Sequence, residues 1–380
     1  MNLSHLFLSA ITALLLISSA AGEVVLERVP DGALQPKAVV DAAGVTHLMT
    51  YRGEAGGGDL FYATRPAGGG AFSPPVRINS VPHSAVSTGT IRGGQFALGK
   101  DELVHVVWNG SRARKGEQPP LFYTRSKAGG AGFEDQRAMS GDWIMDGGGA
   151  VAADAAGNVF VFYHGGKGGG MHDEAGRRVL VRVSRDSGAS FDEEKIISPD
   201  GLGVCGCCAM QAFADSKGRL FAIYRTSADG GKSRDIATMF SADHGKTWRH
   251  EIASRWAIAA CPMSSMSIAQ AGAKVLMGWE KEGQIFVGAW DDANAKLGSI
   301  SPMPGAAAGR KHPVITSDAA GNVLVAWTEG TGWNRGGSVS WQLLDEKLQP
   351  AGEIGRSAGV PVWSFVSAVP AGPPGFTILH

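Results

Sequence analysis

Residues 215–248 read DSKGRLFAIYRTSADGGKSRDIATMFSADHGKTW, and this stretch contains most of one four-stranded β-blade in order. The segment Asp215 to Gly218 predicts a turn, because aspartate hydrogen-bonds its own backbone and glycine adopts positive φ without strain. The segments Leu220 to Tyr224 and Ile236 to Phe240 are apolar runs of strand length. A turn, a strand, a loop and a second strand therefore follow one another within 34 residues.

The last eight residues of that stretch form a compact turn motif, S-x-D-x-G-x-T-W. A second copy, with serine and phenylalanine at the last two positions, lies one repeat earlier along the chain. The aspartate of such a motif accepts backbone N–H bonds inside the turn, the glycine turns the chain, and the aromatic ring packs between sheets. We predict a structural role for the two sets, which are Ser184, Asp186, Gly188 and Phe191, and Ser241, Asp243, Gly245 and Trp248.

The turn-then-strand pattern recurs along the chain. Six strand-like runs end in an aromatic residue at intervals of 48 to 61 residues, at Tyr51, Trp108, Tyr163, Tyr224, Trp279 and Trp327. A repeat of this length containing four short strands is typical of a β-propeller. Residues 364–380 begin a seventh repeat, and Val24 to Val29 is a strand without a repeat of its own. We predict an all-β propeller of seven four-stranded blades, closed by the N-terminal strand as a fourth strand of the last blade.

Composition narrows the function classes. The chain has 380 residues and a formal net charge of +0, which gives no electrostatic basis for binding nucleic acid or an anionic membrane. Residues 1–22 have an apolar run followed by small residues, which predicts a secretory signal peptide. No later stretch reaches the roughly 20 apolar residues of a membrane span. We expect residues 23–380 to form a single exported domain, periplasmic or secreted.

Polar residues follow the aromatic that ends the second strand of each repeat. Propeller topology places these positions, the loops after them and the loops that lead into each blade on one face. Two interpretations remain open: an anion- or sugar-binding cleft, or strand ends that simply meet water. The residues are Arg52, Asn109, His164, Arg225, Glu280 and Glu329, and the loops add His172, Asp173, Glu174, Arg177, Arg178, Trp333, Asn334 and Arg335. Trp333 would either stack on a sugar ring or pack against a neighbouring loop.

All four cysteines fall in two loops that enter the fourth and fifth blades. They are Cys205, Cys207, Cys208 and Cys261. Adjacent blades bring these loops together, so we predict one local unit on the polar face. A disulfide between the 205–208 loop and Cys261 is the default in an oxidising compartment. A soft-metal site is the second hypothesis, copper with methionine and histidine ligands (Met263 or Met210, His164 or His312) or zinc with four thiolates. A free nucleophilic thiol is the third.

The Asp-turn motifs, the C-G-C-C loop, Tyr224-Arg225 and Cys261-Pro-Met263 together resemble the sialidase-like, Asp-box (bacterial neuraminidase repeat) β-propeller superfamily. That resemblance implies six blades as the alternative to seven. It also implies a glycoside hydrolase with three arginines on a substrate carboxylate, a tyrosine–glutamate pair and an acidic acid/base. The Arg-Ile-Pro motif of sialidases is absent, and the comparable LQPKAVV supplies Lys37.

The hypothesis carried forward is a propeller that binds, and in the catalytic variant hydrolyses, a carbohydrate or small anionic ligand on the face bearing the cysteine loops. The catalytic candidates are Glu280 and Glu329 as the carboxylate pair and Tyr224 as the phenol; the ligand-binding candidates are Arg52, Asn109, His164, Arg225, Arg310, His312 and Trp333. The alternatives are a non-catalytic binding or scaffold propeller, and a metal or redox protein using the cysteines.

Overall fold

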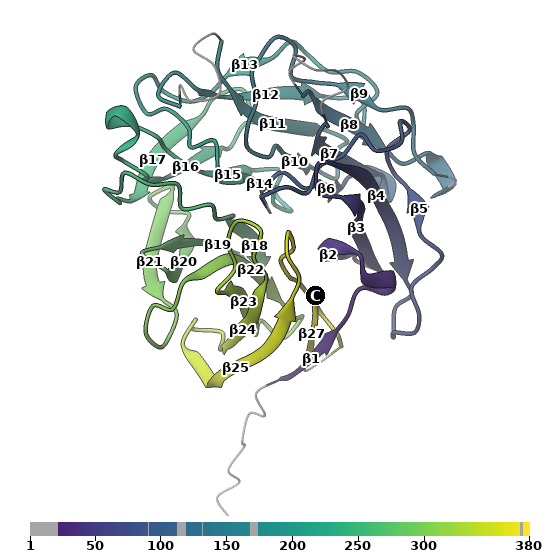
Figure 1. Cartoon of the computed structure of the whole chain (residues 1–380), viewed down its shortest axis with the longest axis vertical. Helices are drawn as coiled ribbons and strands as arrows, with labels where there is room; N and C mark the ends of the chain where they lie inside the picture. The colour runs from purple at the N-terminus through teal and green to yellow at the C-terminus, as the bar shows by residue number, and fades with distance from the viewer. Residues whose placement is uncertain (1–21, 90, 112–118, 131, 168–173, 373–374) are drawn as a thin grey trace, which may run out of the picture.

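The computed structural model describes residues 22–89, 91–111, 119–130, 132–167, 174–372 and 375–380. The predicted signal peptide lies outside this part of the chain except for Gly22. Seven sheets surround a central axis, six with four strands and one with three (Figure 1). The predicted all-β propeller with seven blades is confirmed. Helical turns in the described residues are short 3-10 segments at Pro30–Gly32, Lys100–Glu102, Ala128–Gly130 and Asp229–Gly231.

Each blade runs from an inner strand to an outer one, and neighbouring strands are antiparallel except for β1 and β27 in the last blade. The inner strands are β2 (Leu34–Val40), β6 (Gln95–Leu98), β10 (Ala150–Ala153), β14 (Gln211–Ala214), β18 (Ser267–Ala271), β22 (Arg310–Ser317) and β26 (Ser367–Pro370). The second strands are β3 (Thr46–Glu54), β7 (Val104–Asn109), β11 (Val159–Gly165), β15 (Leu220–Arg225), β19 (Lys274–Lys281), β23 (Val323–Glu329) and β27 (Gly375–Leu379).

The fourth strand is the most exposed strand of each four-stranded blade. The third strands are β4 (Gly57–Arg65), β8 (Leu121–Arg125), β12 (Arg178–Ser184), β16 (Ile236–Ser241), β20 (Gln284–Asp291) and β24 (Gly337–Leu344). The fourth strands are β5 (Val76–Arg77), β9 (Arg137–Ala138), β13 (Lys195–Ile196), β17 (Arg249–Ser254), β21 (Lys296–Pro302) and β25 (Pro350–Val360). None of the helical segments in the described residues is long and apolar enough to cross a membrane.

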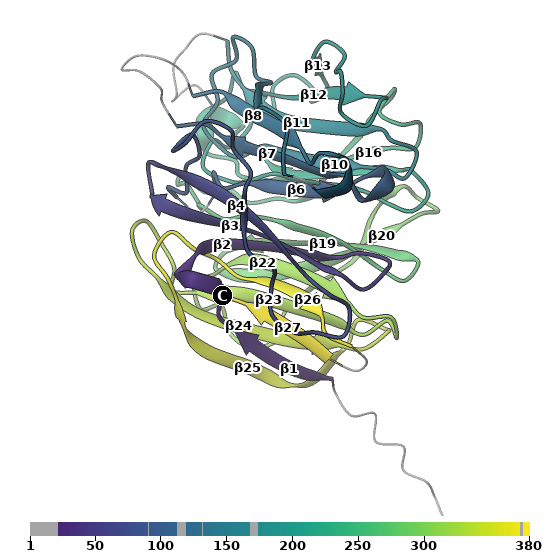
Figure 2. The ribbon, with the colours of Figure 1, turned by 90° about the vertical axis from the view of Figure 1, so that its right-hand side faces the viewer.

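The N-terminal strand closes the ring. β1 (Glu23–Glu27) pairs with β27 in parallel, from Glu23 opposite Gly375 to Glu27 opposite Leu379, and lies beside it in both views (Figures 1 and 2). We expected this strand to stand in fourth place; it has the direction of a fourth strand but occupies third place. β26 occupies one edge of β27, and β1 pairs with the other edge.

The second strands carry the core. Their apolar side chains are buried on both faces because each strand is covered by the blades on either side, and the terminal aromatics Tyr51, Trp108, Tyr163, Tyr224, Trp279 and Trp327 are at most 1% exposed. The Asp-turn aromatics bridge neighbouring blades. Trp248 meets Phe162 of the preceding blade edge-on at 5.7 Å between ring centroids, and Phe191 meets Tyr123 at 4.9 Å. The expected packing of these aromatics between sheets is therefore observed.

The Asp-turn carboxylates are satisfied locally. Oδ1 of Asp243 accepts the backbone N–H groups of Lys246 and Thr247 at 3.1 and 2.9 Å, and Oδ2 accepts the Thr247 hydroxyl at 2.6 Å. Asp186 repeats these contacts with Ser190. Hydrogen bonds from the Ser190 hydroxyl and amide lower the pKa of Asp186 to about 2. The two carboxylates are thus used within their own turns, which stabilise the blade ends.

Replacing Asp243 with alanine is expected to lower the free energy of unfolding by about 1 kcal/mol, because the turn amides it releases are exposed and water can satisfy them in part. Urea unfolding followed by circular dichroism measures the change. Ligand affinity should stay the same, because the Asp243 carboxylate is engaged by residues of its own turn. A variant of wild-type stability that no longer bound ligand would contradict the structural role.

Candidate functional site

The polar residues at the ends of the second strands connect neighbouring blades. Nη2 of Arg225 in the fourth blade donates to the carbonyl oxygen of Glu280 in the fifth at 2.6 Å, and Nη1 donates to the carbonyl oxygen of Arg234 at 3.0 Å. Asn109 in the second blade donates to the carbonyl oxygen of Gly147, which leads into the third, at 2.9 Å. These side chains therefore hold the loop face of the ring together.

The three arginines predicted to bind a substrate carboxylate each have a carboxylate of the protein as partner. Arg52 pairs with Asp31 at 2.9 Å between Nη2 and Oδ2. Arg225 lies 3.5 Å from Glu280, and Arg310 lies 3.3 Å from Glu329. Because each guanidinium is already neutralised, and Arg225 and Arg310 are at most 1% exposed, the three do not form an open anion site.

The two glutamates predicted as the carboxylate pair lie in different blades, Glu280 beside Arg225 and Glu329 beside Arg310. Oε1 of Glu280 accepts the Gly283 amide at 2.9 Å, and Oε1 of Glu329 accepts the Trp327 indole N–H at 2.9 Å. Burial raises the pKa of Glu280, against the lowering effect of Arg225. The structure thus gives both carboxylates positions that stabilise the fold, one at each of two blades.

The predicted phenol is not at the surface. Tyr224 is 1% exposed and belongs to the apolar cluster between the third and fourth blades, where burial raises its pKa well above the usual value. The aromatic ends the strand with its ring directed sideways into the interblade core. Its position therefore gives no support to a nucleophilic role.

The remaining ligand-binding candidates, two histidines and a tryptophan, differ in exposure. His164 and His312 are buried, and burial lowers the pKa of each to about 3, so both are neutral near pH 7. His312 Nδ1 lies 3.1 Å from the Ser265 hydroxyl. Trp333 is 59% exposed and packs edge-on against Trp363 at 5.0 Å between ring centroids. Of the two interpretations of Trp333, packing against a neighbouring loop is the one observed.

The two cysteine loops meet, as predicted, and Glu174 and Arg234 hold them together. Glu174 accepts the Gly206 amide on Oε1 at 2.7 Å and the Arg234 guanidinium on Oε2 at 2.6 Å. Arg234 also donates to the carbonyl oxygen of Ala260 at 3.3 Å. Glu174 and Arg234 therefore join the loop of Cys205–Cys208 to the residue before Cys261. His172 and Asp173, which precede Glu174, lie outside the described residues.

All four cysteines are free in the structure, and the inter-loop disulfide expected from the sequence stays a prediction. Cys205 and Cys208 are buried, Cys207 is partly buried and Cys261 is exposed. Burial would raise the pKa of Cys208, but hydrogen bonds from Cys205 and Cys207 and the charge of Arg225 hold it well below its usual value. A hydrogen bond with Cys207 lowers the pKa of Cys261 to about 7.

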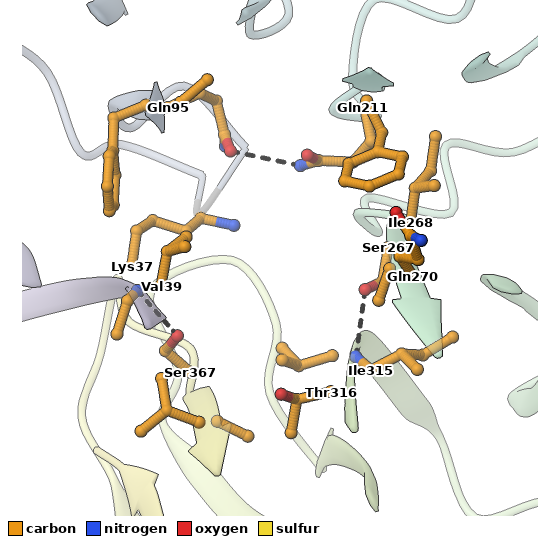
Figure 3. Close-up of a pocket in the computed structure, with 18 of the residues that line it drawn as sticks. Lys37, Val39, Gln95, Gln211, Ser267, Ile268, Gln270, Ile315, Thr316 and Ser367 are labelled. Carbon is orange, nitrogen blue, oxygen red and sulfur yellow. Dashed lines mark hydrogen bonds between the residues drawn. The ribbon is translucent and has the colours of Figure 1, made fainter. Parts of the chain in front are cut away.

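A cavity of about 450 Å³ occupies the axis of the ring and is lined by all seven inner strands (Figure 3). Lys37, Gln95 and Gln211 point into it from three different blades, and Nε2 of Gln211 donates to Oε1 of Gln95 at 3.3 Å. Lining residues next to the turns between first and second strands are partly exposed in every blade, whereas Val366 and Met266 at the other end are buried. We infer that the cavity opens on the Asp-turn face and not on the cysteine face.

Lys37 is the one charged residue among the lining residues. Its ammonium group lies 4.6 Å from the centroid of the Phe365 ring, and it has no carboxylate partner in the described part of the chain. Burial lowers the pKa of Lys37 to about 8. Lys37 is partly exposed, and its side chain points into the cavity.

Sequence reasoning missed the other polar residues of this cavity. Gln95, Gln211 and Gln270 are amides in inner strands, and Phe96 and Phe213 bring aromatic rings to the same lining. The signal was present: a glutamine in a short, otherwise apolar inner strand is unusual unless it faces a polar space. Their convergence was not visible, because they lie in different blades more than 50 residues apart.

Comparison with known proteins places the fold. The sequence matches no protein-family model and no curated protein. Penicillium chrysogenum alpha-L-arabinanase matches with a TM-score of 0.54 and 12% identity, over 84% of this chain and 95% of that one. The leech intramolecular trans-sialidase matches with 0.52 and 10%, over 93% and 86%.

Bacterial sialidases match in the same way. NanB sialidase from Streptococcus pneumoniae gives a TM-score of 0.52 and 10% identity, over 82% of this chain and 68% of that one. The chain spans 64% of the length of the Hadza microbial sialidase Hz136, which gives 0.49 and 13%. At these identities the likeness concerns the fold alone. The chain is a sialidase-like β-propeller by fold.

Proposed function

We propose that this propeller binds an acidic carbohydrate in its axial cavity, with Lys37 as the anion-binding group. The main support for this proposal is the Lys37 ammonium group, which has no carboxylate partner in the described residues and lies in a cavity that is otherwise neutral. The cavity volume of about 450 Å³ falls within the range of ligand pockets, roughly 300–1,000 Å³. It is large enough for one or two sugar rings.

The neutral lining suits a sugar. Amide side chains donate and accept hydrogen bonds, which matches hydroxyl groups that also do both. Aromatic rings such as Phe96 and Phe213 offer apolar faces for the C–H face of a pyranose. Proteins of the same fold that act on sugars include the sialidases and arabinanase above and the polysaccharide lyase Uly1, with a TM-score of 0.51. These likenesses support a carbohydrate ligand without naming it.

The proposed activity is binding and not hydrolysis within the cavity. Glycoside hydrolysis of the usual kind needs two carboxyl groups on either side of the bond. The lining has no aspartate or glutamate, and the two glutamates predicted for that role are paired with Arg225 and Arg310. The alternative of a non-catalytic binding propeller is therefore the one we carry forward.

The pH dependence of binding tests the role of Lys37. A glycan array of carboxylated and sulfated oligosaccharides, with neutral ones matched in length, identifies the ligand at pH 7. Calorimetry then follows its affinity from pH 7 to pH 10. Because an anion binds the protonated amine, we expect the affinity to fall about tenfold per pH unit above about 8.

Two variants complete this test. Lys37→Met should lose most of the affinity and all of the pH dependence, whereas Lys296→Met, a lysine on an outer strand, should behave as wild type. His312 is the titratable neighbour that faces Lys37, and its pKa of about 3 keeps it neutral over this range. Equal binding of acidic and neutral glycans, or an affinity that does not change with pH, would refute the proposal.

A further inference from the structure

The three cysteines of the C-G-C-C loop direct their sulfur atoms to one point. The Sγ atoms of Cys205, Cys207 and Cys208 all lie within 4.8 Å of one another, and those of Cys205 and Cys207 are 3.3 Å apart. A disulfide bond is about 2.05 Å long, so no bond joins these two. Thiolates bound at about 2.3 Å to one metal ion stand about 4 Å apart. The observed distances lie around this value, so small shifts would let the three sulfur atoms bind one ion.

The loop is built to hold this arrangement. A Cβ atom at Gly206 would lie 1.8 Å from Nη1 of Arg177, so a larger residue between Cys205 and Cys207 would have to displace the buried Arg177 side chain. The Gly206 amide is bound by Glu174, and the Cys205 amide donates to the Arg225 carbonyl oxygen at 2.9 Å. The sulfur atoms are therefore positioned before any ion arrives, which removes part of the ordering cost of binding.

A buried imidazole lies beside the same loop. His164 is 0% exposed, and neither ring nitrogen has a hydrogen-bond partner in the described residues. A buried polar group without a partner costs free energy, so it points to an absent one. A Cβ atom at Gly147 would lie 2.5 Å from Nε2 of His164 and 2.8 Å from the Gly206 carbonyl oxygen. The ring and the cysteine loop thus face the same glycine.

We propose that Cys205, Cys207 and Cys208 bind one Cu(I) ion, with His164 beside it and Cys261 as the ligand through which the ion enters. Soft thiolates favour Cu(I), and methionine is a compatible neighbour; Met266 packs in the same cluster as Cys205 and Cys208. Structural zinc sites usually take four ligands with at least two residues between paired cysteines. Here the clustered ligands are three, and the last two are adjacent in the sequence. Arg225 and Arg234 supply positive charge near the thiolates.

Cys261 is suited to entry because it is exposed and because Glu174 and Arg234 join its loop to the loop of Cys205–Cys208. An ion bound first at the surface would pass to the three clustered sulfur atoms by ligand exchange, without a change in oxidation state. This proposal does not depend on the sugar site, which lies in the axial cavity and has a different lining.

The experiment uses the mature chain, reduced and kept free of oxygen. Titration with Cu(I) in competition with bicinchoninate should show one ion per chain, and the ultraviolet thiolate-to-copper band should saturate at the same ratio. Cys207→Ser and Cys208→Ser should each weaken binding at least 100-fold. Cys261→Ser tests the entry role separately: uptake should become slower, while the equilibrium affinity changes by less than tenfold.

A measurement on the wild-type chain guards against misfolded variants. Bound Cu(I) should slow alkylation of Cys207 by iodoacetamide, read by peptide mass spectrometry. Three results would overturn the proposal: zinc binding at these sulfur atoms in preference to Cu(I), unchanged Cu(I) affinity in folded Cys208→Ser, or a native disulfide within the cluster and no Cu(I) binding after its reduction. Intact mass of the unreduced protein detects the disulfide as two missing hydrogens.

Discussion

Replacing Arg225 with methionine is expected to lower the free energy of unfolding by about 3–5 kcal/mol, the usual cost of removing one member of a buried ion pair. Arg225 is 1% exposed and Glu280 is 3% exposed, so the carboxylate would be left without its cation in an apolar place. The guanidinium also joins two blades through the carbonyl oxygens of Arg234 and Glu280. Chemical unfolding monitored by tryptophan fluorescence gives the value.

Measuring the stability lost in Arg225→Met at several pH values separates the effect of the buried charge from the effect of packing. Burial already raises the pKa of Glu280 in the wild type, and removal of the cation raises it further. A carboxyl whose pKa is higher in the folded than in the unfolded state destabilises the fold above the unfolded value and ceases to do so when it is protonated. The Arg225→Met variant should therefore regain part of its stability between pH 8 and pH 5.

The double variant Arg225→Met with Glu280→Met is the control. Replacing a buried ion pair by apolar side chains of similar volume is often close to neutral, so the double variant should be more stable than Arg225→Met alone. A single variant as stable as wild type would show that the pair does not hold the fourth and fifth blades together. Equal loss at pH 5 and pH 8 would assign the effect to packing.

The second large effect concerns ring closure. Leu26→Asp in β1 is expected to lower the free energy of unfolding by about 2–4 kcal/mol, since a charge would enter the apolar cluster that contains Phe376 and Ile378. If β1 detaches, β26 and β27 remain as a two-stranded hairpin, which is marginally stable alone. Thermal unfolding and limited proteolysis at the N-terminus measure the loss.

Val25→Asp is the matched control. Val25 lies next to Leu26 on the same strand, but its side chain points outward and is 47% exposed. The same substitution there should change stability by less than about 0.5 kcal/mol. Equal effects at the two positions, or none at Leu26, would show that β1 contributes little to closure of the ring.

Local chemistry was enough to predict the repeat. Asp215 accepts the amides of Lys217 and Arg219 on Oδ1, at 3.0 and 2.9 Å, which is the turn that its D-x-x-G context predicts. The apolar runs after such turns became second strands, because alternation and length specify a strand without reference to distant residues. Seven blades, the order of strands and the structural role of Asp243 all follow from signals contained within a few residues.

Contacts between blades required the tertiary structure. The sequence identified Arg225, Arg310, Glu280 and Glu329 as polar strand ends, but the direction of each side chain decided whether they face a ligand or one another. Tyr224 was a candidate phenol until its ring was seen between two sheets. A side chain at a strand end turns inward, sideways or outward through a single rotamer choice, and neighbouring blades set that choice.

The sites themselves depend on ring closure. Lys37, Gln95 and Gln211 converge on the axis because seven inner strands stand around it, although more than 50 residues separate each from the next. The clustering of the cysteines in two neighbouring loops was evident from the sequence, and Glu174, Arg234 and His164 joined them only in three dimensions. The amino-acid sequence by itself determined the blades and their turns, because these are made by residues close together in the chain. The tertiary structure decided the cavity, the ion pairs and the sulfur cluster, because these are made by residues that only the closed ring brings into contact.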